Sequence, residues 1–210
     1  MSDELFLDVD RSALPKRHEN DKYITERNLI HAAIDELGPH KSRRILDIGA
    51  NDGRWGLITA AKTLAESLVG VEIEDAPRPL GFTEWYPNTD FMDFDPEFGF
   101  DMIVSNPPYY LAEEIVRRAW SMLAPGGQMV MLLRMAFQTG VDRYRKLWSE
   151  IYPHTVGVCS RRPSFYGGGT NRTEFCVFYW GKSWGGYSLG LPRKWNTVLL
   201  LHERDTNEQD

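Results

Sequence analysis

Short apolar segments alternate with longer amphipathic ones along this chain, and this alternation constrains the fold more than any other feature. Residues 44–48 and 102–105 are short apolar runs, which are typical of buried strands. Residues 25–37 and 111–123 carry apolar side chains at helical spacing. Strands that alternate with helices of roughly 10–15 residues predict an α/β fold, doubly wound, with a mostly parallel sheet covered on both faces.

The remaining segments continue this pattern. Helices are expected after Gly53 and over residues 141–151, and strands are expected at residues 67–72, 128–135, 156–159 and 174–180. The last two strands leave no room for a helix between them, so we expect them to pair antiparallel. Between residues 72 and 93, prolines and a glycine leave little space for a crossover helix, and a short helical turn or an extended loop is expected there.

The chain length favours a single domain, because 210 residues hold neither an internal repeat nor a domain-sized linker. Residues 1–20 are polar and are expected to form a flexible N-terminal segment. Residues 21–183 form the predicted domain. Residues 184–210 are expected to form a C-terminal appendage with a strand at 197–201 and a frayed acidic tail.

Composition excludes several classes of protein. No apolar run approaches the ~20 residues of a membrane span, and the acidic first residues do not resemble a signal peptide. The two cysteines and five dispersed histidines form neither a disulfide framework nor a metal site, so we expect a reduced, cytoplasmic protein without metal. The net charge of −6 argues against a protein that coats nucleic acid nonspecifically, although residues 134–172 hold seven bases and two acids. Solvated charged faces explain this distribution equally well.

The first chemical motif is the turn Asp47-Ile48-Gly49-Ala50-Asn51-Asp52-Gly53, between a predicted strand and a predicted helix. Small residues let the backbone bend sharply and approach a ligand, and a helix N-terminus offers unpaired amides. Glu72 stands at the end of the next predicted strand, where a carboxylate accepts hydrogen bonds from ribose hydroxyls. The glycine turn alone is as consistent with an ordinary tight turn, but together with Glu72 it indicates an adenosine-containing cofactor.

The second motif is Asn106-Pro107-Pro108-Tyr109, which follows an apolar strand. Two prolines fix the backbone and leave carbonyl oxygens pointing in set directions. The Asn106 amide oxygen and the Pro107 carbonyl can accept both hydrogens of one planar amine, and Tyr109 can stack on the ring that carries it. An ordinary Pro-Pro strand exit is the alternative explanation.

These residues resemble the S-adenosylmethionine-dependent methyltransferases of the Rossmann-like class, in the amino-methylating branch with an Asn-Pro-Pro-Tyr motif. The resemblance covers roughly residues 20–180 and is most specific at Asn106–Tyr109. It implies a seven-stranded sheet with an antiparallel last strand and S-adenosyl-L-methionine as cofactor. It also implies that Glu72 holds the ribose and that the following residues contact the cofactor: Tyr23, Thr25, Asp47, Gly49, Ala50, Asn51, Asp93 and Phe94.

The sequence departs from this family pattern at three places. Asn51 stands where the family usually has glycine, Glu26 stands where proline commonly follows the threonine, and the crossover helix after Glu72 is missing. Asparagine tolerates left-handed backbone angles, so the turn is still expected to form. The missing helix leaves the shape of the adenine pocket undefined.

A basic, aromatic, glycine-rich segment lies between the last two strands of the predicted domain. In related amino-methyltransferases the corresponding segment helps to hold the extruded base. The resemblance therefore implies substrate contacts for Arg161, Arg162, Phe165 and Arg172, with the arginines meeting phosphates. A surface loop with Phe165 packed into the core is the alternative.

The resemblance implies methylation of the exocyclic amine of adenine in DNA. Methylation of adenine in ribosomal or other structured RNA is the alternative, followed by methylation of a glutamine amide in a protein and by a non-catalytic cofactor-binding subunit. About 30 residues after Trp180 are too few for a usual target-recognition domain. Either selectivity is low, or the protein works as an oligomer, or a partner supplies recognition.

Overall fold

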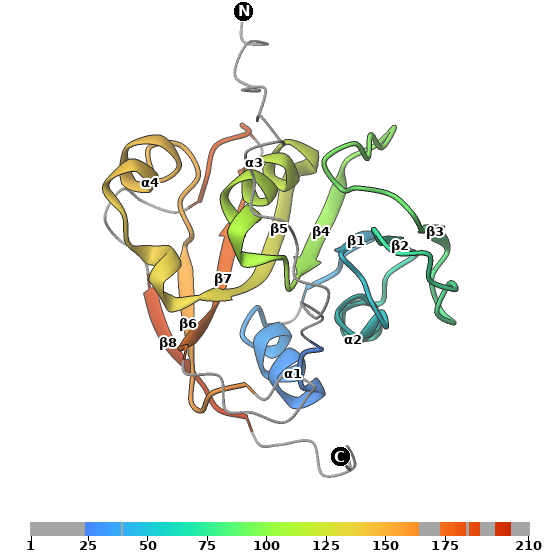
Figure 1. Ribbon diagram of the computed structural model, residues 1–210, viewed down its shortest axis with the longest axis horizontal. Coiled ribbons are helices and arrows are strands. Elements are labelled where there is room, and N and C mark those ends of the chain that lie inside the picture. The colour runs from blue at the N-terminus through green and yellow to red at the C-terminus, as the bar shows by residue number, and fades with distance from the viewer. Residues whose placement is uncertain (1–23, 39, 164–172, 184, 190–195, 203–210) are drawn as a thin grey trace, which may run out of the picture.

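Eight strands form one sheet in the computed structural model, which describes residues 24–38, 40–163, 173–183, 185–189 and 196–202. The strand order is β3-β2-β1-β4-β5-β7-β6-β8 (Figure 1). Every neighbouring pair is parallel except those of β7, which runs antiparallel to both β5 and β6. The antiparallel pairing expected for the strands around residues 156–159 and 174–180 is therefore confirmed.

The strands are β1 (Arg44–Ile48), β2 (Ser67–Val71), β3 (Glu84–Tyr86), β4 (Phe100–Ser105), β5 (Leu123–Arg134), β6 (Thr155–Cys159), β7 (Phe175–Gly181) and β8 (Asn196–Leu200). The α-helices are α1 (Arg27–Asp35), α2 (Arg54–Thr63), α3 (Ala112–Met122) and α4 (Val141–Lys146). Two 3-10 helices, η2 (Tyr109–Leu111) and η3 (Met135–Gln138), follow β4 and β5. The helix predicted at 141–151 is shorter than expected, because α4 ends at Lys146, where the Trp148 amide donates to the Arg143 carbonyl five residues back instead of continuing the four-residue pattern.

The expectation of seven strands is wrong, since the sheet has eight. The strand that the sequence pattern missed is β3, which pairs parallel with β2 and spans only three residues. The connection from β2 to β3 contains no helix, as its prolines predicted. The strand expected at 197–201 is β8, which adds to the sheet parallel to β6, so the last strand in the chain is not the antiparallel one.

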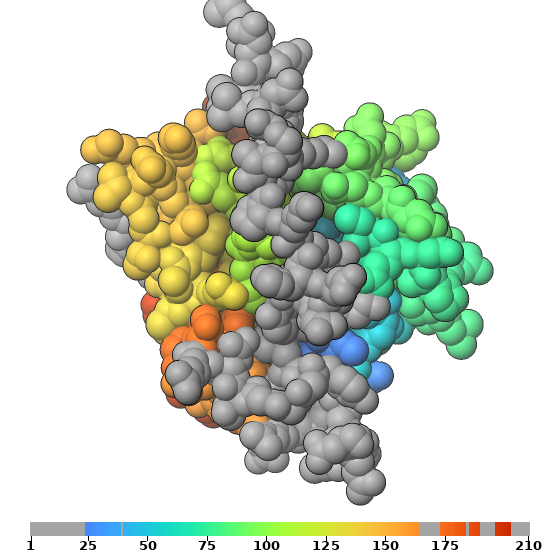
Figure 2. Space-filling view, viewed as in Figure 1, coloured from blue at the N-terminus to red at the C-terminus, as the bar shows by residue number. Residues whose placement is uncertain are grey.

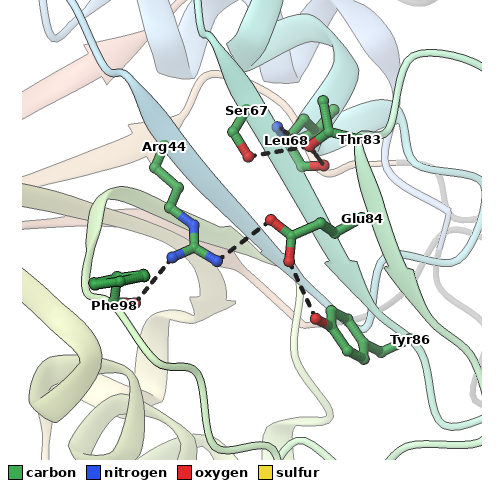
Figure 3. A network of polar contacts seen from close by, with 7 residues as sticks. All are labelled: Arg44, Ser67, Leu68, Thr83, Glu84, Tyr86 and Phe98. Carbon is green, nitrogen blue, oxygen red and sulfur yellow. Dashed lines mark hydrogen bonds and ion pairs between the residues drawn. The ribbon is translucent and has the colours of Figure 1, made fainter.

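Side-chain contacts hold the short strand β3 in place (Figure 3). The Arg44 guanidinium on β1 reaches across β2 to the Glu84 carboxylate at 3.4 Å and also donates to the Phe98 carbonyl. Just before β3, the Thr83 hydroxyl donates to the carbonyl of Leu68 and accepts from its amide. A strand this short is thus specified by its neighbours rather than by its own periodicity.

Helices cover both faces of the sheet. On one face α1 and α2 pack over the sheet, with Ile30 and Ile58 in one apolar cluster. On the other face α3 packs with Ile115 and Val116, joined by residues that follow α4. Figure 2 shows that the α4 and β3 regions lie at opposite ends of the molecule in this view. The doubly wound architecture is confirmed, and none of the helices in the described ranges is long and apolar enough to cross a membrane.

Candidate active site

The glycine turn lies at the carboxyl end of β1, where three residues have left-handed backbone angles. Gly49, Asn51 and Gly53 have φ values of 62°, 50° and 78°. The amides of Gly49 and Ala50 both donate to the Val71 carbonyl at the end of β2, at 2.9 and 3.2 Å. Asparagine is among the residues that tolerate positive φ, so Asn51 preserves the turn. Among the residues that the structure describes, none has an atom within 4 Å of a side chain added at Gly49.

Glu72 connects this turn to the end of β2. Its carboxylate is buried, accepts a 2.8 Å hydrogen bond from the Asn51 amide, and accepts a second bond of 3.0 Å from the Glu74 amide. Each carboxylate oxygen has two lone-pair sites, so acceptor capacity remains on both. The carboxylate therefore shapes the turn and retains the chemistry that a ribose diol requires.

Asp47 lies beneath the first turn of α2. Its Oδ2 accepts a 2.8 Å hydrogen bond from the Gly56 amide, and a Cβ at Gly56 would stand 2.9 Å from that oxygen. Burial raises the pKa of Asp47 well above its usual range, against the lowering effect of the Gly56 bond. The negative charges of Asp52 and Glu72 raise it further. Asp47 thus helps to seat α2 behind the glycine turn.

Asn106 stands beside the glycine turn because β4 pairs with β1, with Ser105 opposite Ile48. The Ser105 hydroxyl donates to the Ile48 carbonyl at 2.8 Å and fixes this juncture. The Asn106 amide nitrogen donates to the Thr25 hydroxyl oxygen at 3.1 Å, and its oxygen accepts from the Tyr109 hydroxyl at 2.9 Å. Both ends of the amide are therefore oriented.

Thr25 was expected to contact the cofactor, and the structure places its side chain against Asn106 and Trp55. It is buried, and its hydroxyl oxygen accepts a 3.0 Å hydrogen bond from the Trp55 indole nitrogen. Its carbonyl accepts from the Arg54 guanidinium at 2.8 Å. An indole N–H can only donate, so the Thr25 oxygen is held as an acceptor. This link between the segment before α1, the start of α2 and Asn106 has no signal in the local sequence.

The Tyr109 ring contacts two residues that the sequence did not single out. The Phe175 ring lies 5.3 Å away at a 48° tilt, and the Arg134 guanidinium lies 5.0 Å from the ring centroid. Phe175 and Arg134 are paired across β7 and β5. Only strand register brings them to Tyr109, so no motif could have identified them.

The other predicted site residues are placed as follows. Asp93 is exposed, whereas Phe94 is buried with its ring 5.0 Å from Tyr86. Arg161 is half-buried, and the Arg162 guanidinium makes bonds of 2.9 and 2.6 Å to the Glu174 carboxylate. Tyr23, Phe165 and Arg172 lie outside the described residues. Among the residues that the structure describes, no group of acids, histidines and cysteines is arranged to hold a metal ion.

Comparison with known proteins gives a limited match in sequence. No family model matches the chain. The ribosomal RNA small subunit methyltransferase C of Chromohalobacter salexigens is 28% identical over 121 residues, which cover 50% of this chain and 36% of that protein. This chain thus spans about a third of the length of the curated relative that it matches.

Solved structures of low sequence identity share the architecture. The methyltransferase subunit of a type I restriction-modification system from Streptococcus thermophilus matches with a TM-score of 0.58 at 15% identity, over 75% of this chain and 44% of that chain. The N-methyltransferase NodS of Bradyrhizobium japonicum, in complex with S-adenosyl-L-homocysteine, matches with a TM-score of 0.52 at 17% identity, over 74% of this chain and 84% of that chain. The fold is that of the class I methyltransferases. In this fold the glycine turn, Glu72 and Asn106 meet at the carboxyl edge of the sheet.

Proposed function

We propose that this chain is an S-adenosylmethionine-dependent methyltransferase that methylates the exocyclic amine of adenine in DNA. The observation that carries the proposal is the oriented amide of Asn106, held through its nitrogen by Thr25 beside the glycine turn. Its oxygen is thereby directed as an acceptor, which is the role that a planar amine requires.

The residues at this edge fit the proposed cofactor. No described residue crowds the backbone at Gly49, and the Glu72 carboxylate retains acceptor sites for the two ribose hydroxyls. When bound, S-adenosylmethionine supplies an electrophilic methyl group on a sulfonium. We propose that Glu72 holds the ribose, while Gly49, Ala50 and Asn51 adjoin the methionine portion.

The chain's own contribution to transfer is positioning and electrostatics. An aromatic amine is a weak nucleophile because its lone pair is delocalised into the ring. Hydrogen bonds from its two hydrogens to the Asn106 amide oxygen and the Pro107 carbonyl would localise that lone pair on nitrogen. The Tyr109 hydroxyl also donates to the Asn106 oxygen, and an amide oxygen can accept two hydrogen bonds. Alignment of nucleophile and methyl group then supplies much of the acceleration.

The motif order, with Thr25 before the glycine turn and Asn106–Tyr109 after it, resembles that of adenine methyltransferases, and among these we choose DNA as the acceptor. The similarity to a restriction-modification methyltransferase subunit is consistent with this choice. One observation favours a second candidate, methylation of adenine in RNA, because the curated relative is named as a ribosomal RNA methyltransferase.

The proposal is tested by transfer of a tritiated methyl group from S-adenosylmethionine to duplex DNA, single-stranded DNA, total RNA and protein extract, followed by nucleoside analysis. We expect N6-methyladenine in the DNA fraction, absent with Asn106→Ala and unchanged with the matched control Asn196→Ala, which alters an exposed asparagine on β8. Calorimetry shows whether Asn106→Ala still binds the cofactor. If the label were found only in RNA or protein, the acceptor would be that molecule and not DNA. Full activity in Asn106→Ala would overturn the mechanism.

A further inference from the structure

A pocket of about 250 Å³ opens beside Tyr109. It lies between η2, η3 and α4, where the strands β4 and β5 end. Its polar lining includes two tyrosines and two arginines, and no carboxylate. The residues that matter here are Tyr109, Tyr110, Arg134, Phe137 and Arg143.

Arg134 is the cation in this pocket that remains available for a ligand. Its side chain is exposed, and its guanidinium lies over the Tyr109 ring. Within the described parts of the chain it makes no hydrogen bond or ion pair. Glu174, which adjoins the residue paired with Arg134 on the neighbouring strand, is bound by Arg162 instead. The fork of donors on Arg134 therefore lacks an anion.

Arg143 has a different role, because its guanidinium already has partners within the protein. One terminal nitrogen donates to the carbonyls of Phe137 and Thr139, at 3.1 and 2.7 Å, and its Nε lies 3.6 Å from the Glu113 carboxylate. It fixes the wall of the pocket and adds positive charge. Beyond it, Arg145 and Lys146 are exposed on α4.

We propose that this pocket binds a phosphodiester group of a nucleic-acid strand, with Arg134 as the anion-binding residue. The inference deepens the proposed function and rests on it for the direction from which the acceptor enters. A guanidinium binds phosphate through two parallel N–H bonds and at the same time stacks on an aromatic ring, which an ammonium cannot do. The Tyr109 ring supplies that stacking surface, and the exposed Tyr110 supplies a second aromatic face for a base.

The charges favour a nucleic acid over a peptide acceptor. A glutamine side chain is neutral and would leave the Arg134 cation unpaired, whereas each nucleotide carries a negatively charged phosphate that can pair with it. Glu113, the carboxylate paired with the pocket residue Arg143, also pairs with Arg117, and Glu174 pairs with Arg162, so both negative charges near Arg134 are already matched by arginines. A phosphate that reaches Arg134 stands next to the ring proposed to stack on the target base.

The experiment measures binding rather than methyl transfer. Fluorescence anisotropy follows a labelled single-stranded DNA and an RNA of the same sequence with the full chain, without cofactor, across a salt series. Each phosphate bound on a single strand contributes roughly 0.7 to the slope of log affinity against log salt. We expect Arg134→Ala to lower this slope by about 0.7. We expect Arg134→Lys to keep most of the slope.

The control is Arg43→Ala, which removes one exposed arginine at the opposite edge of the sheet, where β1 begins. Equal slopes for Arg134→Ala and Arg43→Ala would overturn the phosphate site while leaving the proposed function to its own assay. If the salt slope falls in Arg134→Ala but not in Arg43→Ala, and the transfer assay shows no methylation of any nucleic acid, the phosphate site is kept and the proposed function is overturned. Binding of neither strand, with methylation of a protein, would overturn both.

Discussion

The Thr25 hydroxyl oxygen lies 3.1 Å from the Asn106 amide nitrogen, although 81 positions separate the two residues. The amide has a donating and an accepting end, and only the accepting end can bind a hydrogen of an amine. Thr25 binds the donating end, and this contact determines which end of the amide is presented as the hydrogen-bond acceptor. We therefore regard Thr25 as a positioning residue for the proposed transfer.

Thr25→Val is expected to impair turnover more than binding. Valine matches threonine in shape but lacks the hydroxyl, so the Asn106 amide loses its anchor and samples the wrong orientation. We expect kcat to fall at least about tenfold with little change in KM, because misalignment acts on the reacting geometry. Thr25→Ser retains the hydroxyl and is expected to restore most of the activity. A rise in KM alone, or equal losses in both variants, would contradict the positioning role.

Trp55 makes it possible to separate stability from activity. In Thr25→Val the buried Trp55 N–H loses its acceptor, which costs about 1–3 kcal/mol in the free energy of unfolding. Adding Trp55→Phe removes that N–H, so urea unfolding of the double variant is expected to show a cost well below the sum of the two single costs. Methyl transfer is expected to stay low in the double variant. Recovery of activity together with stability would show that Thr25 acts only through Trp55.

The two cysteines are expected to be unreactive in the folded protein. Burial raises the pKa of Cys159 to about 12 and that of Cys176 to about 11. At pH 8 the thiolate, which is the reactive form, is then about one part in ten thousand and one in a thousand, respectively. Labelling with a disulfide reagent is expected to be slow in buffer and rapid in urea, where two thiols per chain react. Rapid reaction of both thiols in buffer would contradict the burial of these strands.

Local periodicity predicted the elements that depend on local sequence. The alternation of strands and helices and the antiparallel pairing of β6 with β7 follow from segment length and spacing. The same reasoning placed Glu72 and Asn106 at the ends of β2 and β4, because the carboxyl ends of parallel strands meet at one edge of a sheet.

Contacts between distant segments could not be predicted in this way. Strand β3 is too short for a periodic signal, and it depends on Arg44 and Thr83 from outside its own residues. The contact of Arg134 with Tyr109 depends on how β5 lies beside β4. The anchoring of Asn106 by Thr25 depends on the packing of the segment before α1 against α2, which no spacing in the sequence encodes.

The buried carboxyl of Asp47 predicts a pH dependence of stability. Burial raises its pKa above the value in the unfolded chain, so between these two values the folded protein binds the proton and the unfolded chain does not. The contribution of Asp47 to the free energy of unfolding is therefore greatest below the unfolded pKa and is lost as pH rises through the folded one.

Asp47→Asn keeps an acceptor for the Gly56 amide and removes the ionisation. We expect urea unfolding from pH 4 to pH 8 at constant ionic strength to show that the free energy of unfolding of Asp47→Asn, relative to the wild type, increases with pH. The control Asp95→Asn, at an exposed site, is not expected to show this increase. Parallel curves for Asp47→Asn and the wild type would mean that this carboxyl does not titrate differently in the two states.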